Sequence, residues 1–384
     1  MNGSSTFHTS GWTRRRHIAT SLALACSLVF GSGVALAQST VKLGFIGPIS
    51  GGNAQQGLGA KNGFLLAIDQ FNATPGAPFK VEGVVLDDAS DPQTGVSAAL
   101  KLVNDRSVVA ATGHWNSPVA LATLPVFNRS QMPFIVWGAI SPKITEQNFP
   151  NTTRVTPTLV NENKPLAERA ISDLKAKKIA IISDTSDYGR ANETWFRKFF
   201  TDAGGTIVTA ESFPVGTTDF RAILTKVQGL QPDAVYFGGV ITEAGILRKQ
   251  MADLGIKMPM LSISGIYDPQ LIKIAGPAAD GVVVGVPVSQ SNPKLEAMNK
   301  AYTEKAYPEA QSPYTKYAYD ATGLLLQVLK TTGTTDKAAI AKAIRAASYD
   351  GALGTTTFDA NGQTQIPVDI QLHTVKNGEW VKYQ

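Results

Sequence analysis

The sequence predicts an α/β protein made of two doubly wound, Rossmann-like lobes joined by a three-segment hinge. Short apolar, β-branched runs recur along the chain, and each is followed by a loop of Gly, Ser, Asp or Pro and then by a stretch of helical period. Several runs, such as Ile179–Ile182, are apolar throughout, which is typical of strands covered on both faces by helices. Nine such runs exceed what one mononucleotide-type unit needs, so the pattern favours two lobes.

The strands are predicted from their composition and from the turn residues that follow them. Residues 166–174 repeat apolar side chains at helical spacing, with Asn161 or Asn163 placed to cap that helix. In chain order, the predicted strands are Val41–Ile46, Phe79–Leu86, Val108–Thr112, Phe134–Trp137, Lys178–Ile182, Thr206–Glu211, Ala234–Phe237, Met260–Ile263 and Gly281–Val286.

The alternation of strand and helix ends near Pro293. Three helical segments follow, at Asn292–Tyr307, Tyr314–Lys330 and Asp336–Ala347. A glycine-rich turn region at 351–362 then leads to a last strand hairpin, Ile366–Thr374 with Glu379–Tyr383.

The rhythm changes at Arg154–Thr158, Gly285–Val288 and Gly351–Thr357, which we predict to be the crossings between the lobes. The N-terminal lobe then comprises residues 38–156 with 287–353, and the C-terminal lobe comprises residues 157–286 with 354–384. Parallel crossings of this kind permit rigid-body closure about a cleft.

Residues 1–37 have the composition of a secretory signal peptide. Three arginines at 14–16 precede an apolar stretch from Ile18 to Leu36, and Ala35-Leu36-Ala37 is a small-x-small cleavage site. Serines and glycines interrupt the stretch, which favours cleavage near Ala37 over a membrane anchor. The general and the twin-arginine export routes both stay open, as does a lipid anchor at Cys26.

Cleavage after Ala37 changes what the composition implies. It removes three basic residues and no acid, so the formal charge falls from +5 to +2, and 347 of the 384 residues remain. The electrostatic case for a nucleic-acid partner is thereby lost. The single cysteine, Cys26, is also removed, which excludes a disulfide, a thiol nucleophile and a Cys-based metal site from the mature protein.

Three motifs are similar to catalytic or cofactor sites without meeting their requirements. The glycines of Gly57–Gly63 lack the dinucleotide-binding spacing. The acidic string Asp87–Pro92 matches a metal-binding pattern, but it follows a strand and ends in proline, so we predict turn and capping aspartates. His114 lies near Ser117 without a nucleophile elbow, and with His373 it makes only two histidines after residue 37, too few for a zinc site.

The loops at the carboxyl ends of the predicted strands form the candidate site, because ligands bind at that edge of open α/β sheets. They supply aromatic faces, hydroxyls and N–H groups, but not a base, a nucleophile and an orienting group together. We therefore predict binding without catalysis, and neither a metal nor a cofactor. The residues of these loops proposed to line the site are Trp115, Asn116, Ser117, Gly138, Ala139, Ile140, Tyr188, Val240 and Ser264.

Sequence motifs spread over the whole chain after the leader support a family resemblance. They are V-K-L-G-F-I-G-P-I-S-G from Val41, D-D-A-S-D-P from Asp87, G-H-W-N-S from Gly113, S-P-K-I-T from Ser141, D-Y-G from Asp187, Y-F-G-G from Tyr236 and I-A-G from Ile274. In order and spacing they resemble the periplasmic leucine/isoleucine/valine-type substrate-binding proteins of ABC importers. The resemblance implies a type I periplasmic binding fold and a ligand enclosed between two lobes.

Residue by residue, the resemblance assigns roles within the site. It implies that Ser117 holds the ligand's carboxylate, that Ala139 and Ile140 complete the anion site, and that Tyr188 closes on the ligand. Three positions depart from the family pattern: Ile140 replaces a threonine, Gln56 replaces a tryptophan beside the ligand's side chain, and Ser264 replaces a glutamate that pairs with the ligand's ammonium. A buried ammonium without a carboxylate is costly, so an aromatic or aliphatic organic acid is a rival ligand.

The sequence thus predicts a periplasmic receptor whose partners are a small carboxylate-bearing ligand, an apolar amino acid or an organic acid, and the ABC permease in the inner membrane. We expect a monomer with no nucleic-acid partner. An exported Rossmann-like enzyme and a sensory receptor domain of the same fold are the alternatives.

Overall fold

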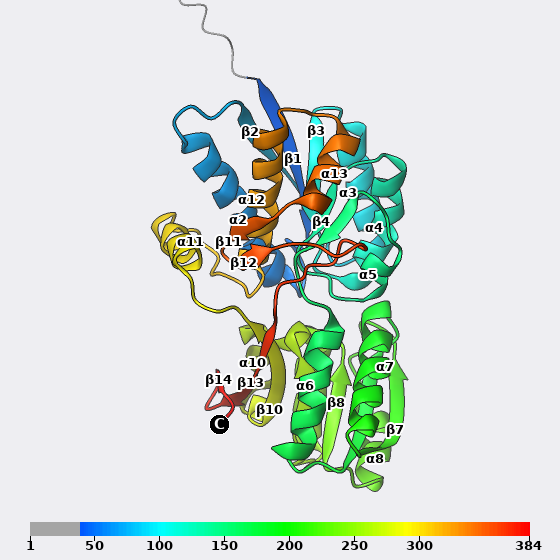
Figure 1. The fold of residues 1–384 in the computed structure, drawn as a ribbon. Coiled ribbons are helices and arrows are strands. Elements are labelled where there is room, and N and C mark those ends of the chain that lie inside the picture. The colour runs from blue at the N-terminus through cyan, green and yellow to red at the C-terminus, as the bar shows by residue number, and fades with distance from the viewer. Residues whose placement is uncertain (1–38) are drawn as a thin grey trace, which may run out of the picture. The chain divides into compact units, whose positions relative to one another are not determined.

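The computed structural model describes residues 39–384, of which Thr40–Gln384 forms one compact unit. The predicted signal peptide and Cys26 lie outside the described residues. Two β-sheets, each with helices on both faces, organise the unit (Figure 1). Among residues 39–384, no helix combines the length and the apolar character needed to cross a membrane.

The first sheet is wholly parallel, with strand order β2-β1-β3-β4-β5. Alternate side chains of β1 enter different cores: Leu43 and Phe45 pack with Phe64, whereas Ile46 packs with Leu102 and Leu124. Helices α2 and α12 therefore cover one face, and α3 and α4 cover the other. The strands are β1 Thr40–Gly47, β2 Lys80–Asp87, β3 Val108–Gly113, β4 Phe134–Val136 and β5 Thr152–Arg154, and the helices of this lobe up to β5 are α2 Ala54–Ala73, α3 Pro92–Asn104, α4 Ser117–Arg129 and α5 Lys143–Glu146.

The second sheet has the order β14-β13-β10-β9-β8-β6-β7, parallel from β10 to β7 and antiparallel at β13 and β14. Ile179 and Ile181 pack with the aromatic residues of α7, and Ala180 and Ile182 pack on the other face. The strands are β6 Lys178–Asp184, β7 Thr206–Phe213, β8 Ala234–Gly238, β9 Met260–Ile263, β10 Val282–Val288, β13 Asp369–Lys376 and β14 Glu379–Lys382, and the helices are α6 Leu159–Ser172, α7 Asp187–Asp202, α8 Arg221–Gly229, α9 Ile241–Asp253 and α10 Pro269–Ala275, with short 3-10 turns η1 Ser264–Ile266 and η2 Gly276–Ala279.

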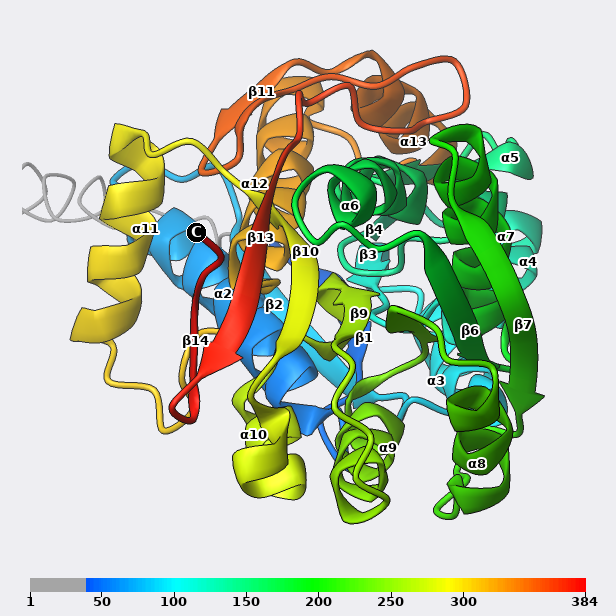
Figure 2. The same ribbon diagram turned by 90° about the horizontal axis from the view of Figure 1, so that it is seen from below.

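The chain returns to the first sheet after β10. Helix α12 then packs along α2 and contacts β3 (Figures 1 and 2). A small hairpin after α13 is held by buried Asp320, whose carboxylate accepts hydrogen bonds from the N–H groups of Ala352 and Leu353. The elements of this return are α11 Pro293–Glu304, α12 Thr315–Thr332, α13 Lys337–Ala346, β11 Tyr349–Gly351 and β12 Gly354–Thr356.

The fold class predicted from the sequence is confirmed. All nine predicted strands, the three late helices and the final hairpin are present within a few residues. Strand β5 and the hairpin β11–β12 were not predicted, because these three-residue strands, unlike the equally short but wholly apolar β4, consist mostly of polar residues and glycine. The predicted cap of α6 was wrong: Thr158 is the N-cap, and Asn161 accepts a hydrogen bond from its N–H in a capping box.

The boundaries of the lobes follow from where the ladders end. Strand β10 stays paired with β13 as far as Val288, and Thr364 still donates a hydrogen bond to Arg154 of the first lobe. We therefore propose crossings at 155–158, 289–292 and 365–368. The second begins 4 residues, and the third 14 residues, after the start of the crossing that the sequence pattern favoured, because β10 is longer than its apolar run and the glycine-rich region folds back on the first sheet.

Candidate functional site

A cavity of about 250 Å³ lies where the carboxyl ends of the two sheets meet, and loops from both lobes line it. This is the expected position for a ligand site. In each sheet, consecutive strands are added first on one side and then on the other, at β1 in the first sheet and at β6 in the second, and the loops that diverge there leave a crevice. The structure brings seven of the ten predicted residues to this cavity: Trp115, Asn116, Ser117, Gly138, Ile140, Tyr188 and Val240.

Ser117 lies at the first turn of α4 and is the centre of the candidate anion site. Asn116 is the N-cap, and its side chain makes no capping hydrogen bond, so the N–H groups of Ser117 and Val119 lack that partner at the helix end that borders the cavity. The Ser117 Oγ accepts a hydrogen bond of 3.1 Å from the Ser141 N–H, which leaves its own hydroxyl hydrogen able to donate. A carboxylate here would meet a hydroxyl and the positive end of a helix.

Arg154 fixes the loop that faces Ser117. Its guanidinium is fully buried and donates hydrogen bonds to the carbonyls of Ala139 and Ser141, at 3.3 and 2.6 Å, and to Thr145 Oγ1 at 3.2 Å. Its Nε donates to the side-chain carbonyl of Gln363 at 2.7 Å. Burial lowers the pKa of Arg154 to about 9, so it stays charged at neutral pH. The carbonyls of the loop are thereby turned toward the core.

Ala139 does not line the cavity. It is fully buried, and its N–H donates a hydrogen bond of 2.9 Å to the carbonyl of His114. Gly138 allows the two loops to approach, because a Cβ there would lie 3.0 Å from the His114 carbonyl oxygen and from Trp115 Cα. Ala139 therefore ties the loop after β4 to the loop after β3, and Ile140 reaches the cavity.

Tyr188 forms the wall contributed by the second lobe. The side chain comes from the start of α7, is only 8% exposed, and has no hydrogen-bond partner for its hydroxyl among the described residues. It packs against Gly265, where an added Cβ would lie 2.1 Å from the hydroxyl oxygen. A buried, unpartnered hydroxyl at a cavity wall is available to a ligand.

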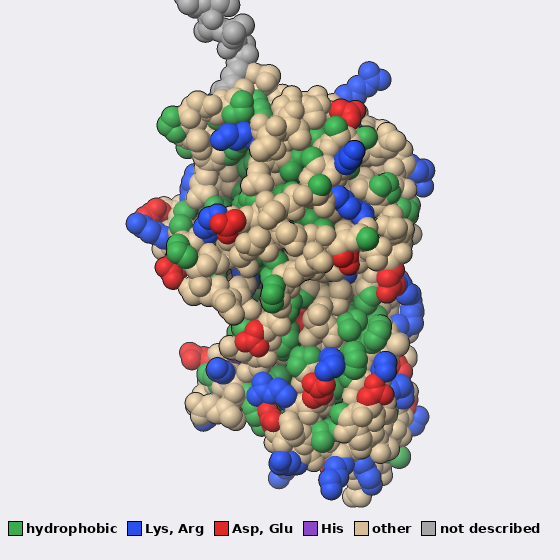
Figure 3. Space-filling model, viewed as in Figure 1, with side chains coloured by type: hydrophobic (Ala, Val, Ile, Leu, Met, Phe, Trp, Pro, Cys, Tyr) green, Lys and Arg blue, Asp and Glu red, His purple; other side chains and the backbone are tan. Residues whose placement is uncertain are grey.

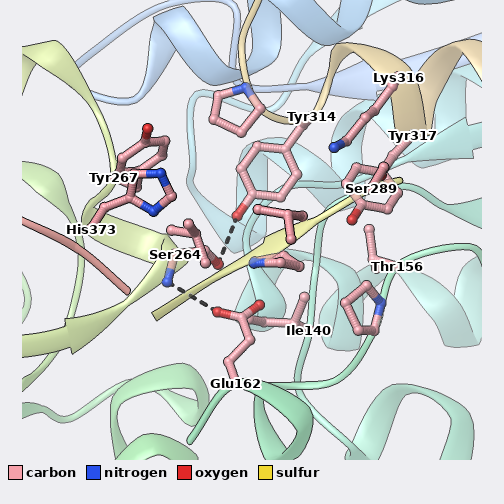
Figure 4. Close-up of a pocket in the computed structure, with 15 residues that line it drawn as sticks. Ile140, Thr156, Glu162, Ser264, Tyr267, Ser289, Tyr314, Lys316, Tyr317 and His373 are labelled. Atoms are coloured by element: carbon pink, nitrogen blue, oxygen red, sulfur yellow. Dashed lines mark hydrogen bonds between the residues drawn. The ribbon is translucent and has the colours of Figure 1, made fainter. Parts of the chain in front are cut away.

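Two predicted residues take other positions. Gln56 does not reach the cavity; its Nε2 donates a buried hydrogen bond of 2.5 Å to Asp268 of the other lobe. Ser264 lines a second cavity of about 310 Å³, which shares Ile140 and Tyr314 with the first (Figure 4). The position of Gln56 therefore does not support the prediction that it lies beside a ligand. Its side chain extends from α2 to Asp268, the N-cap of α10.

Sequence reasoning missed three acids and one aromatic residue at these cavities. Asp184 and Glu243 line the first cavity, Glu162 lines the second, and Tyr314 lies between them with its ring 6.1 Å from that of Trp115. Burial raises the pKa of Asp184, and the nearby Glu243 adds to this. Asp184 could have been predicted, since it lies two residues after the predicted strand Lys178–Ile182, whereas no local signal marks Glu162 or Tyr314.

The histidine and aspartate motifs have structural roles. His114 is buried, with its Nδ1 2.8 Å from Asp88 Oδ2 and its Nε2 2.9 Å from Thr123 Oγ1, so it is not paired with Ser117. Asp91 caps α3 through the Thr94 N–H, as predicted for this turn. No cluster of three or more potential metal-ligating side chains occurs within residues 39–384.

The fold and the cavity define a class: a two-lobed protein that receives a small ligand between its sheets. The sequence profile of the periplasmic binding protein family matches residues 40–379. The chain belongs to this family, which consists of binding components rather than enzymes, and the resemblance predicted from the sequence is confirmed.

Individual relatives agree in length as well as in fold. The Leu/Ile/Val-binding protein homolog 1 of Brucella suis is 32% identical over 357 residues, which cover 92% of this chain and 94% of the relative. The structure is similar to the branched-chain amino acid transporter substrate-binding protein LivJ of Streptococcus pneumoniae in complex with isoleucine, with 27% identity, a TM-score of 0.80, and coverage of 90% of this chain and 100% of that one. It is also similar to a solute-binding protein of an ABC transporter from Rhodopseudomonas palustris in complex with 3,4-dihydroxybenzoic acid, with 25% identity, a TM-score of 0.77, and coverage of 90% and 96%.

Proposed function

We propose that this protein is the periplasmic substrate-binding component of an ABC importer of the branched-chain or hydrophobic amino-acid type. The observation that carries the proposal is the cavity between the lobes, with an anion site at Ser117 on one side and Tyr188 on the other. Contacts from both lobes would favour the closed arrangement of the ligand-bound protein, which is what a permease can distinguish.

The proposal includes the location and partners of the protein. The leader is proposed to direct export and to be cleaved near Ala37, and the closed form to dock as a monomer on the permease in the inner membrane. Lys and Arg side chains are interspersed with Asp and Glu on the face shown in Figure 3, which favours a small ligand over nucleic acid. No catalytic role is proposed, because the titratable side chains at the cavities are not arranged around a nucleophile.

An aromatic or aliphatic organic acid is the second candidate ligand. The edge of Trp115 against Tyr314 gives the cavity an aromatic wall, and the Rhodopseudomonas relative holds an aromatic acid. An amino acid and an organic acid share the carboxylate, so the anion site alone does not separate them.

A thermal-shift screen of the purified mature protein tests the receptor role. Amino acids, aliphatic acids and aromatic acids are compared, and a ligand at about 100 times its Kd should add about 2.7 kcal/mol to the free energy of unfolding. We expect strong stabilisation by at least one carboxylate ligand. Failure of all three classes to stabilise the protein would contradict the proposal.

Ser117→Ala is expected to weaken binding of the ligand identified by the screen by roughly 10- to 100-fold, because a hydrogen bond to a charged group is worth about 1.5–3 kcal/mol. Isothermal titration calorimetry measures this change. Ser130→Ala is the matched control at the other end of α4, where the hydroxyl donates only to the Phe127 carbonyl. Equal affinities in both variants would show that the anion site is misplaced.

A further inference from the structure

Glu162 places a carboxyl group deep between the two lobes. It lies in the first turn of α6, its residue is 1% exposed, and its Oε2 accepts a hydrogen bond of 3.0 Å from the Ser264 N–H. Figure 4 shows the carboxyl group directed from α6 toward Ser264, with the Tyr314 hydroxyl on the far side of that serine. The group therefore faces the cavity rather than the core of its own lobe.

No cation pairs with this carboxylate within residues 39–384. The ion pairs of the described chain do not include Glu162. Besides Ser264, its electrostatic neighbours are tyrosines from three elements: Tyr188 of α7, Tyr236 of β8, and Tyr314 and Tyr317 at the start of α12. Burial raises the pKa of Glu162 to about 7. An ionised carboxylate in such surroundings is costly unless a positive group reaches it.

The cavity of Ser117 and the cavity of Glu162 are neighbours. Ile140 and Tyr314 line both of them, and Tyr188, which lines the first, is an electrostatic neighbour of Glu162. A small molecule held by its carboxylate at the start of α4 would have to pass between Ile140 and Tyr314 to reach the acid. The far end of the second cavity is lined by Lys316 and His373.

We propose that Glu162 binds a protonated amine of the ligand, so that the substrate class is a zwitterionic amino acid and not a simple organic acid. The inference rests on the proposed receptor function and specifies its ligand. The Ser264 hydroxyl is neutral and cannot form an ion pair with a cation, but the Ser264 N–H donates a hydrogen bond that holds the Glu162 carboxylate in place. The acid that the β9 loop lacks is thus supplied by α6.

Paired probes test this assignment. L-leucine and 4-methylpentanoate share a carbon skeleton and a carboxylate and differ in the amine, and titration calorimetry gives the affinity of each. We expect the wild-type protein to prefer L-leucine by roughly 100-fold, in line with the coupling of close charge pairs at desolvated sites. Glu162→Gln should reduce that preference to less than about 5-fold, while the affinity for 4-methylpentanoate stays within about 3-fold of wild type.

Glu168→Gln is the matched control, because Glu168 lies on the same helix, α6, with a half-exposed side chain paired with Lys164. It should leave the preference for the amine unchanged. Glu243→Gln tests the rival acid, because Glu243 lines the cavity of Ser117 and its Oε1 accepts a hydrogen bond from the Gly216 N–H. Loss of the preference in Glu243→Gln, with Glu162→Gln like wild type, would overturn the assignment to Glu162. Equal binding of both probes to the wild-type protein would overturn the amino-acid class but leave the receptor role standing, whereas binding of neither, in a protein that no ligand of the screen stabilises, would remove the receptor role itself.

The pH dependence of affinity provides a second readout in the unmodified protein. Pairing with an ammonium requires Glu162 to be ionised, and protons compete for this carboxyl group, whose pKa is about 7. The affinity for L-leucine should therefore weaken as the pH falls from 8 to 5.5 and level off above about 7.5. Protonation of His373, whose pKa burial lowers, would act in the same direction, so His373→Gln serves to separate the two. The slope should persist in His373→Gln and disappear in Glu162→Gln; the reverse pattern would contradict the proposal.

Discussion

Replacement of Arg154 by methionine is expected to cost both stability and ligand binding. The substitution leaves the carbonyls of Ala139 and Ser141 buried without their donor, and each unsatisfied buried group costs about 1–3 kcal/mol. We expect a loss of about 3–5 kcal/mol in the free energy of unfolding, measured by urea denaturation. Because the same carbonyls belong to the loop facing Ser117, affinity should fall by at least about 10-fold in the fraction that folds.

Arg169→Met is the control for loss of a guanidinium. Arg169 pairs with Asp173 one turn away on the exposed side of α6, at 2.7 Å, and such pairs contribute about 0.3–0.5 kcal/mol. If Arg154→Met were no more destabilising than Arg169→Met, the role given to Arg154 in orienting the loop would be wrong.

Removal of the Tyr188 ring is expected to have the largest effect on binding. Tyr188→Ala deletes a wall of the cavity and should reduce affinity by at least about 100-fold, with a loss of about 3 kcal/mol in stability from the cavity left behind. Calorimetric titration and thermal unfolding measure the two effects. An affinity within twofold of wild type would show that the ligand does not contact this residue.

Tyr188→Phe separates the ring from its hydroxyl. Since the hydroxyl has no hydrogen-bond partner among the described residues, its removal should leave stability unchanged or slightly raised. A roughly 10-fold loss of affinity in this variant would show that the hydroxyl bonds to the ligand.

The parts of the fold that could be predicted from the sequence are those with local signals. Apolar runs such as Ile179–Ile182 mark strands because both of their faces are buried, and the glycine and proline turns after them locate the loops of the site. The loops of Ser117 and Tyr188 were located in this way, and the family resemblance assigned the roles of these two residues. Each lies four residues after the end of a strand, where the topology itself concentrates ligand contacts.

The parts that could not be predicted depend on contacts between distant segments. Glu162 and Ser264 are 102 residues apart, and Gln56 and Asp268 are 212 apart, so no spacing along the chain indicates either pair. Gln56 was predicted to line the site from its position in the family pattern, but its side-chain amide bonds to Asp268 of the other lobe. Residues in the first turn of a helix read as capping or solvated positions, which is why Glu162 did not stand out.

The late position of α12 in the chain affects the order in which the protein can fold. The strands of the first sheet are made first, but α12, which packs along α2 and contacts β3, begins only at Thr315. Until that segment is available, the apolar face around Phe45 is covered by α2 alone, so the first lobe cannot complete its core before most of the chain exists. A polypeptide built this way stays incompletely folded for most of its synthesis, which is the state in which a chain can be threaded through a membrane before its final structure forms.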